Sequence, residues 1–368
     1  MAATVTPQMK AIVFAGGIGT RMWPLSRKKS PKQFEPIIDN QSTLQLTVDR
    51  LRPEFAPENI YISTGIQYVP LIKKQLPFIP EKNIIGEPEM RDVGPAVGYL
   101  MAIIAKTDPN SPVAIIWSDH LIKRVDIFKN AILTGGEYLL KNPDKYVFIG
   151  QKPRFANQNL GWIEYGATLG HQNGLTLNSF QSWYYRPPLA KAKAFFADGK
   201  HAWNPGYFVV TPQTVLKAYQ KEAPGLFKDL MTLKASYGTP SHSSQLQQLY
   251  PKFEKISFDD LIIVKVPKDK AIVLSVDMEW SDVGTWEALK EALKPDKKAN
   301  LTHGQVVAYD TQDSVIYGFT SQLVTTIDLE DMVVVVTKDT ILVTKQASIP
   351  KIKAMLKSFA GTKLEKYT

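Results

Sequence analysis

FAGGIGTRMWPLSRKKSPKQF, from Phe14 to Phe34, is a glycine- and arginine-rich loop that closes an apolar run, KAIVF. An apolar run that ends on small residues and glycine is typical of a buried strand entering a loop. Beyond the loop, helix-like and extended segments alternate at βα spacing to about residue 150. This alternation predicts a parallel, doubly wound α/β sheet. Ligands of such sheets bind at the carboxyl ends of the strands, which is where this loop begins.

The residue types in the loop indicate a phosphate ligand. Gly16, Gly17 and Gly19 permit a close approach of the backbone, with N–H groups turned toward polyphosphate oxygens. Arg21 and Lys32 place positive charge where a pyrophosphate develops negative charge. A simple tight turn and a dinucleotide site are the alternatives for a glycine-rich loop after a strand. The loop lacks the third glycine of G-x-G-x-x-G and the Lys-Ser/Thr pair of a P-loop, so the dinucleotide and P-loop interpretations lose support.

Composition excludes several classes of protein. The chain has 368 residues, with 44 Lys and Arg against 35 Asp and Glu, a net charge of +9 and no cysteine. Disulfides, iron–sulfur clusters, thiolate zinc sites and a cysteine nucleophile are therefore excluded. No apolar run approaches the roughly 18 residues of a membrane span, and signal-peptide features are absent, so we expect a cytoplasmic protein with no membrane partner. The densest basic stretch is the loop itself, which carries no RNA-binding signature, so no nucleic-acid partner is expected.

The pattern of apolar and polar residues changes after the lysine-rich stretch ALKPDKKANLTHG. Five short strands at about ten-residue spacing follow, and then an amphipathic helix, IPKIKAMLKSFAG. We therefore expect a tail over residues 1–8, a catalytic domain over 9–295, and a small β-rich unit over 296–368 that is β-helix-like or a small sheet. Regular short strands often dock onto another copy, so this unit is a candidate surface for a homo-oligomer.

AGGIGTRMWPLSRKKSPKQF resembles the signature of the sugar-nucleotide pyrophosphorylases, a family of nucleotidyltransferases. Its WPLSR and PKQF portions are similar to the mannose-1-phosphate guanylyltransferase branch. Further motifs follow in the family's order: GEPEMRDVGPAVG, WSDHLI, GWIEYG, WNPGYF and WSDVGTW. The resemblance covers roughly residues 9 to 345. It implies a Rossmann-like, GT-A-type domain with a mixed, mostly parallel sheet, followed by a β-helix-like unit.

The resemblance also implies roles for individual residues. Catalytic roles fall to Arg21 and Lys32. Nucleotide binding is implied for Ala15, Gly16, Gly17, Gly19, Thr20, Glu87, Arg91, Asp92, Pro95 and Ser118. Contacts with the sugar phosphate are implied for Gly161, Glu164, Arg186 and Asn204. Asp119 of WSDHLI and Asp282 of WSDVGTW are implied as ligands of Mg²⁺, the expected cofactor.

Elementary chemistry supports the metal assignment. Mg²⁺ takes hard oxygen ligands, usually one or two carboxylates completed by phosphates and water. Asp119 and Asp282 each lie at the expected end of a strand. A single aspartate there is as often a turn cap, but two in matching motifs favour the metal. His120 is expected to hydrogen-bond beside the site rather than to bind the ion.

Three positions depart from the family pattern. Tyr185-Arg186-Pro187 stands where the family has E-K-P, so a planar guanidinium replaces the lysine expected on the sugar phosphate. Asp92 replaces the asparagine of R-N-T-A-P, and its carboxylate is able to accept from both N1–H and N2–H₂ of guanine. Val264 stands where a late carboxylate is expected, which weakens the transfer of roles around it.

The resulting hypothesis is a Mg²⁺-dependent enzyme that transfers GMP from GTP to mannose 1-phosphate, giving GDP-mannose and pyrophosphate. The transfer proceeds by in-line attack on the α-phosphate, without a covalent intermediate. Two alternatives stay open. One is another pair of nucleoside triphosphate and hexose 1-phosphate, and the other is a non-catalytic regulator that binds sugar nucleotides.

Overall fold

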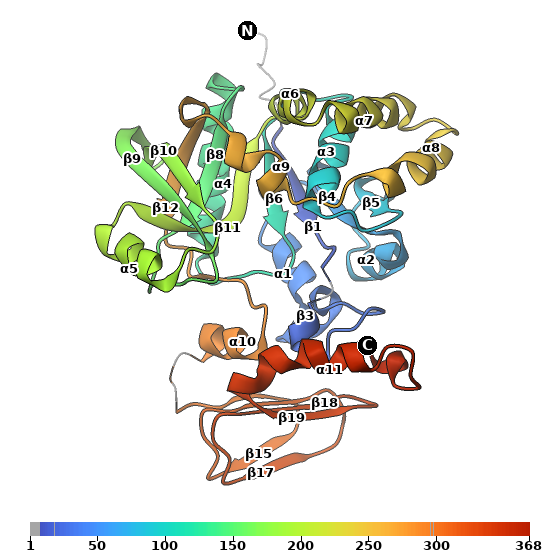
Figure 1. Cartoon of the computed structure of the whole chain (residues 1–368), viewed down its shortest axis with the longest axis vertical. Coiled ribbons are helices and arrows are strands. Elements are labelled where there is room, and N and C mark those ends of the chain that lie inside the picture. The colour runs from blue at the N-terminus through green and yellow to red at the C-terminus, as the bar shows by residue number, and fades with distance from the viewer. Residues whose placement is uncertain (1–7, 18, 295, 297) are drawn as a thin grey trace. The chain divides into compact units, whose positions relative to one another are not determined.

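The computed structural model describes residues 8–17, 19–294, 296 and 298–368 (Figure 1). The chain forms two compact units. The first unit contains the residues up to 16, 48–118 and 122–280, and the second contains 17–47, 119–121 and 281–368. The domain boundary expected between residues 295 and 296 differs from the division into compact units. The glycine-rich loop belongs to the same unit as the C-terminal residues. The expected tail over 1–8 lies almost wholly outside the described residues.

A nine-stranded mixed sheet forms the centre of the first unit (Figure 1). Its strand order is β5 (Ile84–Glu87), β4 (Ile60–Gly65), β1 (Lys10–Phe14), β6 (Val113–Trp117), β11 (His201–Val210), β8 (Tyr146–Gln151), β12 (Ala271–Val276), β10 (Leu175–Tyr184) and β9 (Gly161–Gln172). Neighbours from β5 to β6 are parallel, as are β8 and β12, whereas β11 is antiparallel to β6 and β8. β10 and β9 form an antiparallel pair. The predicted mixed, mostly parallel sheet is confirmed.

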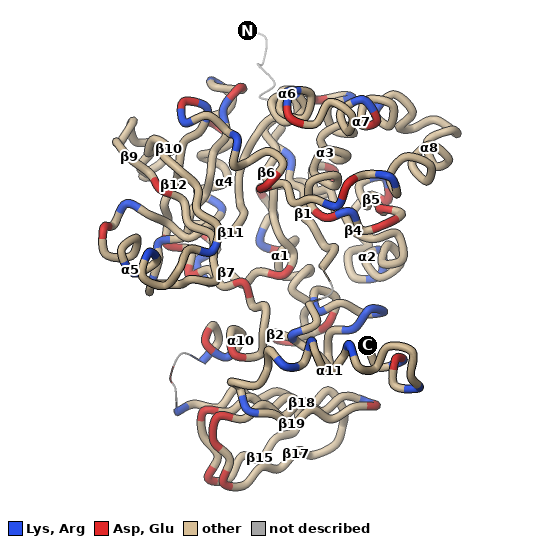
Figure 2. Tube along the Cα trace, viewed as in Figure 1, with Lys and Arg blue, Asp and Glu red and all other residues tan. Residues whose placement is uncertain are grey.

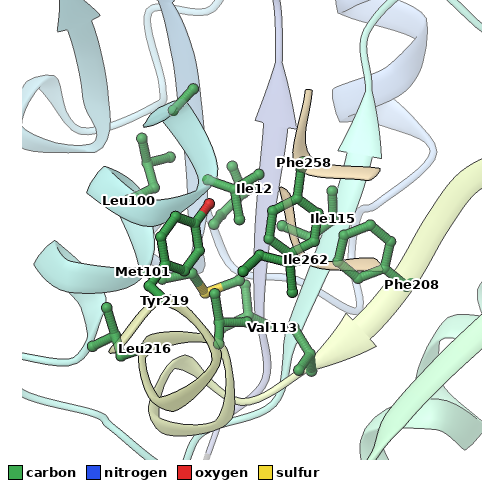
Figure 3. Close-up of a cluster of buried hydrophobic side chains, with 14 of the residues drawn as sticks. Ile12, Leu100, Met101, Val113, Ile115, Phe208, Leu216, Tyr219, Phe258 and Ile262 are labelled. Carbon is green, nitrogen blue, oxygen red and sulfur yellow. The ribbon is translucent and has the colours of Figure 1, made fainter. Parts of the chain in front are cut away.

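One face of this sheet carries the main hydrophobic core of the first unit. Four helices pack around it: α3 (Val93–Ile104), α6 (Pro212–Glu222), α7 (Pro224–Ser236) and α9 (Phe258–Leu261). Figure 3 shows the centre of this core, where Ile12 and Ile115 of the sheet face Leu100 of α3 and Tyr219 of α6. Because side chains alternate along a strand, these strands present their other residues to the opposite face.

The opposite face is covered by α4 (Val125–Lys141), which packs on β11, β8, β12 and β6. Phe208 belongs to the main core, whereas its neighbour Val209 lies beside Gly135 of α4. The remaining helices that carry residues of this unit are α1 (Thr43–Asp49), α2 (Val69–Gln75), α5 (Leu189–Asp198) and α8 (His242–Leu249). Among the described residues, none of the helices has the length and apolar character needed to cross a membrane.

The second unit is built on short strands that wind as a β-helix-like coil. β14 (Leu301–His303), β16 (Val315–Gly318), β18 (Met332–Val336) and β19 (Ile341–Lys345) form one sheet in that order, and β15 (Val306–Tyr309) pairs with β17 (Val324–Ile327) in another. The pairs β14–β16, β16–β18 and β15–β17 are parallel, so successive coils stack in register. Asp310 and Asp328 take positive φ at equivalent turns, which Asp tolerates better than most residues, and acidic residues gather there in Figure 2. The predicted β-helix-like unit is confirmed.

A separate core joins the glycine-rich loop to the coil within the second unit. Met22, Trp23 and Leu25 are buried with Trp286 of α10 (Trp286–Leu293) and with side chains from the C-terminal residues, including Val315, Tyr317, Val333, Val335, Leu342, Ile352 and Leu356. The loop also carries two short paired strands, β2 (Pro36–Ile38) and β3 (Gln41–Ser42). The chain passes between the units within β7 (Leu121–Ile122) and β13 (Trp280–Ser281).

The terminal helix is shorter than its sequence pattern. The α-helical part, α11, covers Ile352–Ser358, and a 3₁₀ helix over Gln346–Lys351 precedes it. Pro350 lies inside the 3₁₀ segment and has no backbone N–H to donate, so the α-helical ladder begins only after it.

Candidate active site

Lys32 is the centre of the candidate site in the second unit. It begins a 3₁₀ helix over Lys32–Phe34, and its side chain is buried. Its Nζ lies 3.1 Å from Asp119 Oδ2 and donates to the carbonyl oxygen of Val283 at 3.2 Å. Its backbone N–H donates to Ser26 Oγ at 3.0 Å. The ammonium is therefore held at a fixed point, beside one of the two predicted metal ligands.

Asp119 stays ionised at neutral pH in this setting. Burial acts to raise its pKa, but the charges of Lys32 and His120 and the hydrogen bond from Lys32 outweigh burial, so the pKa lies below its ordinary value. His120 Nε2 lies 3.8 Å from Asp119 Oδ1. His120 thus lies next to a predicted metal ligand, and its expected hydrogen-bonding role beside the site stays a prediction.

Arg21 and Asp282 approach each other over Gly284. A methyl group placed on Gly284 would lie 3.0 Å from Arg21 Nη2 and 3.4 Å from Asp282 Oδ2. Asp282 directly precedes Val283, whose carbonyl oxygen accepts from Lys32. The structure thus brings four predicted residues together in the second unit: Arg21, Lys32, Asp119 and Asp282. The exposed Arg21 and the partly exposed carboxylates are open to a ligand.

The donor set fits a hard divalent cation that shares its ligands with phosphate. Asp119 contacts Lys32, and Asp282 directly precedes Val283, which also contacts Lys32; both carboxylates are partly exposed. Within residues 8–17, 19–294, 296 and 298–368, no three or more His, Cys, Asp or Glu side chains gather to form a complete protein cage. Mg²⁺ ordinarily takes one or two carboxylates and completes its shell with phosphates and water, so these two residues suffice.

The glycines of the loop leave open space at its start. Gly16 and Gly17 have no atom within 4 Å of the position that a β-carbon would take. Gly19 adopts a φ of 64°, in the left-handed region that favours glycine, just before a 3₁₀ helix over Thr20–Met22. Backbone N–H groups in such a loop are accessible to phosphate oxygens.

Ala15 and Ser118 lie at the ends of the paired strands β1 and β6. Ala15 N donates to Ser63 O at 2.8 Å, and Ala15 O accepts from Thr64 Oγ1 at 2.8 Å. Ser118 N donates to Phe14 O at 3.1 Å. These bonds fix the main chain at the carboxyl ends of the two strands, where the sequence predicted a nucleotide.

The residues predicted to contact the sugar lie on adjacent strands of the first unit. Asn204 of β11 pairs in register with Gly161 of β9, and His201 pairs with Glu164. Glu164 Oε2 accepts from the hydroxyl of Tyr184 at 2.8 Å, and Asn204 Oδ1 accepts from the backbone N–H of Gly206 at 2.8 Å. The structure therefore brings Asn204 beside Gly161, whereas Glu164 lies three residues further along β9, where the alternation of side chains directs it to the opposite face. Both polar side chains are partly exposed.

Arg186 occupies the turn that follows β10. It is exposed, has a φ of 43°, and its guanidinium lies 5.1 Å from the centre of the Tyr185 ring. Tyr184, the last residue of β10, pairs with Trp162 of β9, next to Gly161. This pairing places the turn at the same edge as the predicted sugar-binding strands.

Glu87 is engaged with the protein rather than open to a ligand. Its Oε1 accepts from Ser63 Oγ at 2.7 Å and its Oε2 accepts from the hydroxyl of Tyr250 at 2.7 Å. Burial raises the pKa of Glu87, and these two hydrogen bonds lower it in part. The motif that contains Glu87 gave no sign of this role, because Tyr250 lies 163 residues away in sequence.

The remaining residues of the same motif lie at the start of α3. Asp92 has a φ of 66°, and its carboxylate accepts from the backbone N–H of Val93 at 2.8 Å. Arg91 Nη2 is paired with Glu89 at 2.5 Å, and Pro95 is buried in the first turn of the helix. Asp92 therefore caps α3, which is a structural role beside its predicted contact with the nucleotide.

Two of the three departures from the family pattern, Asp92 and Val264, line one pocket of the first unit, together with Tyr185, the neighbour of Arg186. The volume of this cavity is about 370 Å³. Asp259 lines it as well, and burial, followed by the charges of Asp260 and Asp92, raises the pKa of Asp259 to about 6. Asp259 is not among the residues predicted from the sequence, although the Asp-Asp pair in SFDDLIIVK was an available signal. Perturbed carboxylates in a cleft are typical of binding sites.

Sequence and fold are similar to those of known proteins. Residues 10–299 match the nucleotidyl transferase family, and residues 304–359 match the MannoseP isomerase/GMP-like beta-helix domain. A mannose-1-phosphate guanylyltransferase from Escherichia coli is 29% identical over 347 residues, which are 93% of this chain and 74% of that protein. Mannose-1-phosphate guanylyltransferase 2 from Escherichia coli O157:H7 is 30% identical over 362 residues, which are 94% of this chain and 72% of that protein. A solved structure from Thermus thermophilus, described as a mannose-1-phosphate geranyltransferase, has a TM-score of 0.83 at 25% identity and covers 96% of this chain and 99% of that chain.

Proposed function

Because the chain belongs to the nucleotidyl transferase family, with mannose-1-phosphate guanylyltransferases among its relatives, we propose that it transfers GMP from GTP to mannose 1-phosphate. The observation that carries this proposal is the cluster of Arg21, Lys32, Asp119 and Asp282, which offers cations and hard anions at one place. Phosphoryl and nucleotidyl transfer depend mainly on positioning and charge stabilisation, which such a cluster supplies. The products are GDP-mannose and pyrophosphate.

The reaction is an in-line displacement at the α-phosphorus of GTP. A phosphate oxygen of mannose 1-phosphate forms the new bond, and the bond from the α-phosphorus to the oxygen bridging it to the β-phosphate breaks. Lys32, whose Nζ is fixed by Asp119 and Val283, holds the transferring phosphate as its charge builds. Arg21 and the loop amides hold the β- and γ-phosphates, which leave as pyrophosphate. No residue of the chain needs to form a covalent intermediate.

Asp119 and Asp282 would hold Mg²⁺, which neutralises phosphate charge when bound. Both carboxylates are partly exposed, as ligands shared with phosphate must be. In the first unit, Glu164 and Asn204 are proposed to bind hexose hydroxyls and Arg186 the sugar phosphate. Asp92 is proposed to accept from the guanine N–H groups beside the pocket that it lines.

Two further proposals concern the setting of the enzyme. We propose a cytoplasmic location, because a chain with no cysteine has no disulfide to form in an oxidising compartment. We also propose a homo-oligomer through the coil, where Tyr309 and Ile327 pair in register and are 63% and 69% exposed. Adjacent exposed apolar side chains are a candidate contact surface for a second copy. Light scattering of the wild type and of Ile327→Lys tests this: a dimer that becomes a monomer supports it, and a monomeric wild type contradicts it.

Pyrophosphate release tests the reaction. The assay contains Mg²⁺ and mannose 1-phosphate and compares GTP with ATP, UTP, CTP and dTTP, and glucose 1-phosphate replaces mannose 1-phosphate as the matched sugar control. Release confined to GTP and mannose 1-phosphate supports the proposal. Release with another pair would support nucleotidyl transfer but contradict the proposed specificity. This is the main alternative, because Asp92, Arg186 and Val264 depart from the family pattern. Binding of GDP-mannose without any release would indicate a regulator instead.

A further inference from the structure

Arg27 ties the glycine-rich loop to a turn of the β-helix-like coil. Its Nη1 and Nη2 donate to the two carboxylate oxygens of Asp339, at 2.8 and 2.6 Å. Nη2 also donates to Thr340 Oγ1 at 3.1 Å and to Thr337 Oγ1 at 3.4 Å, while Nε donates to Pro24 O at 2.9 Å. A guanidinium bound on both edges fixes orientation as well as distance, which an ammonium does not.

The chain on both sides of Arg27 is held by C-terminal residues of the same unit. Trp23 Nε1 donates to Tyr367 O at 2.8 Å, and the Trp23 ring lies edge-on to Phe359 with 6.4 Å between ring centres. Lys28 N donates to Thr368 O at 3.4 Å. The segment from residue 23 to 28 is therefore anchored before, at and after Arg27.

This anchored segment is coupled to Lys32 by two short links. Ser26, which precedes Arg27, accepts from the backbone N–H of Lys32 through its buried hydroxyl at 3.0 Å. Arg27 and Ser30 exchange backbone hydrogen bonds of 3.0 and 3.1 Å, which close the turn between Ser26 and Lys32. A displacement of Arg27 therefore moves the backbone that carries Lys32, and with it the contact between Lys32 and Asp119.

We propose that Arg27 and Asp339 form a positioning pair that sets the place of Lys32 in the active site. The catalytic consequence rests on the proposed function, since neither residue of the pair belongs to the proposed catalytic cluster. By this inference the coil takes part in the reaction by holding the loop, in addition to any role in assembly. Loss of the pair should loosen Lys32 while the hydrophobic cores described above stay intact, because Asp339 is exposed at the surface.

The first experiment measures the exposure of Lys32 without reference to activity. Asp339→Asn and Arg27→Lys each weaken the pair at nearly constant size, and Asp328→Asn makes the same acid-to-amide change at another exposed turn of the coil. An amine-reactive label is added briefly to the folded proteins, and mass spectrometry gives the labelling rate of Lys32. We expect a several-fold faster rate in Asp339→Asn and Arg27→Lys and the wild-type rate in Asp328→Asn. Wild-type protection of Lys32 in both pair variants would overturn the inference.

The second experiment asks whether Asp339 acts through Lys32. Asp339→Asn should lower kcat by roughly 10-fold, since misplacing a catalytic group by about 1 Å can cost about 100-fold, and should leave the KM for mannose 1-phosphate near its wild-type value. In a Lys32→Ala background the same change should have no further effect on kcat. Independent, additive losses would overturn the inference. A wild type that releases no pyrophosphate counts against the proposed function alone, and the labelling experiment still decides the positioning pair.

Discussion

Gly19→Ala should displace the side chain of Lys32 and lower turnover, although Lys32 itself is unchanged. Gly19 has a φ of 64°, where an L-residue such as alanine costs roughly 1–2 kcal/mol. The added methyl carbon would lie 2.9 Å from Cδ and 3.0 Å from Cγ of Lys32. Carbon atoms prefer about 3.5–4.0 Å, so these methylenes must move by roughly 0.5–1 Å. Movement is hindered because the far end of the side chain is bound to Asp119 and Val283.

The size of the effect follows from those bonds. Hydrogen bonds to charged groups contribute about 1.5–3 kcal/mol each. If the displaced ammonium loses one such bond in the transition state, turnover falls roughly 10- to 150-fold, because about 1.4 kcal/mol corresponds to a factor of ten. The free energy of unfolding should fall by only about 1–2 kcal/mol, which is the cost of the backbone strain.

Gly199→Ala is the matched control. Gly199 ends α5 with the same φ of 64°, and no atom lies within 4 Å of the position of its added methyl. Urea unfolding and pyrophosphate release are measured on both variants. We expect similar losses of stability in the two, and a loss of turnover only in Gly19→Ala. Equal turnover in the two variants would refute the reasoning, as would a comparable loss in Gly199→Ala.

Three further predictions follow from the site and the cores. Asp282→Asn should lower pyrophosphate release by orders of magnitude at an unchanged Tm; near-wild-type release would remove Asp282 from the metal site. The pKa of Asp259 is raised to about 6 in the folded chain against about 3.9 when unfolded, so the folded state keeps the proton longer and wild-type stability should fall as pH rises from about 4 to about 6. Asp259→Asn should abolish that fall in melting experiments across this range, and parallel profiles would contradict the assignment. Leu289→Ala, at a side chain with no exposure, should cost roughly 2–5 kcal/mol in urea unfolding, whereas Leu323→Ala, 59% exposed, should stay within about 0.5 kcal/mol; equal costs would mean that the second core does not stabilise the chain.

Local sequence patterns were sufficient for much of the fold. KAIVF became β1, with β4 and β6 as its parallel neighbours, as is typical of a short apolar run that ends at glycine. Four of the five short runs after residue 300 became parallel strands of the coil, and the fifth became β19, which is antiparallel to β18. The residues that the loop sequence nominated, Arg21 and Lys32, lie in one cluster with the two predicted metal ligands.

Partners from distant parts of the chain account for what those patterns did not predict. The carboxylate of Glu87, expected at a nucleotide, is taken by Ser63 and by Tyr250, which is 163 residues away. Burial and the charges of Asp260 and Asp92 raise the pKa of Asp259. The residues next to Asp259 in the sequence do not reveal that burial. The pairing of Arg27 with Asp339 spans 312 residues.

The glycine-rich loop shows most clearly what the local sequence does not predict, namely the compact unit to which a segment belongs. Its strand, its glycines and its charges could be read from about twenty consecutive residues, since backbone preference and charge are local properties. Only the tertiary structure shows that the loop packs with the C-terminal residues. There, Trp286 Nε1 donates to the carbonyl oxygen of Trp23, 263 residues earlier in the chain. Apolar side chains gain by burial against any complementary surface, so hydrophobicity predicts that Trp23 is buried, and only the folded chain specifies against which residues.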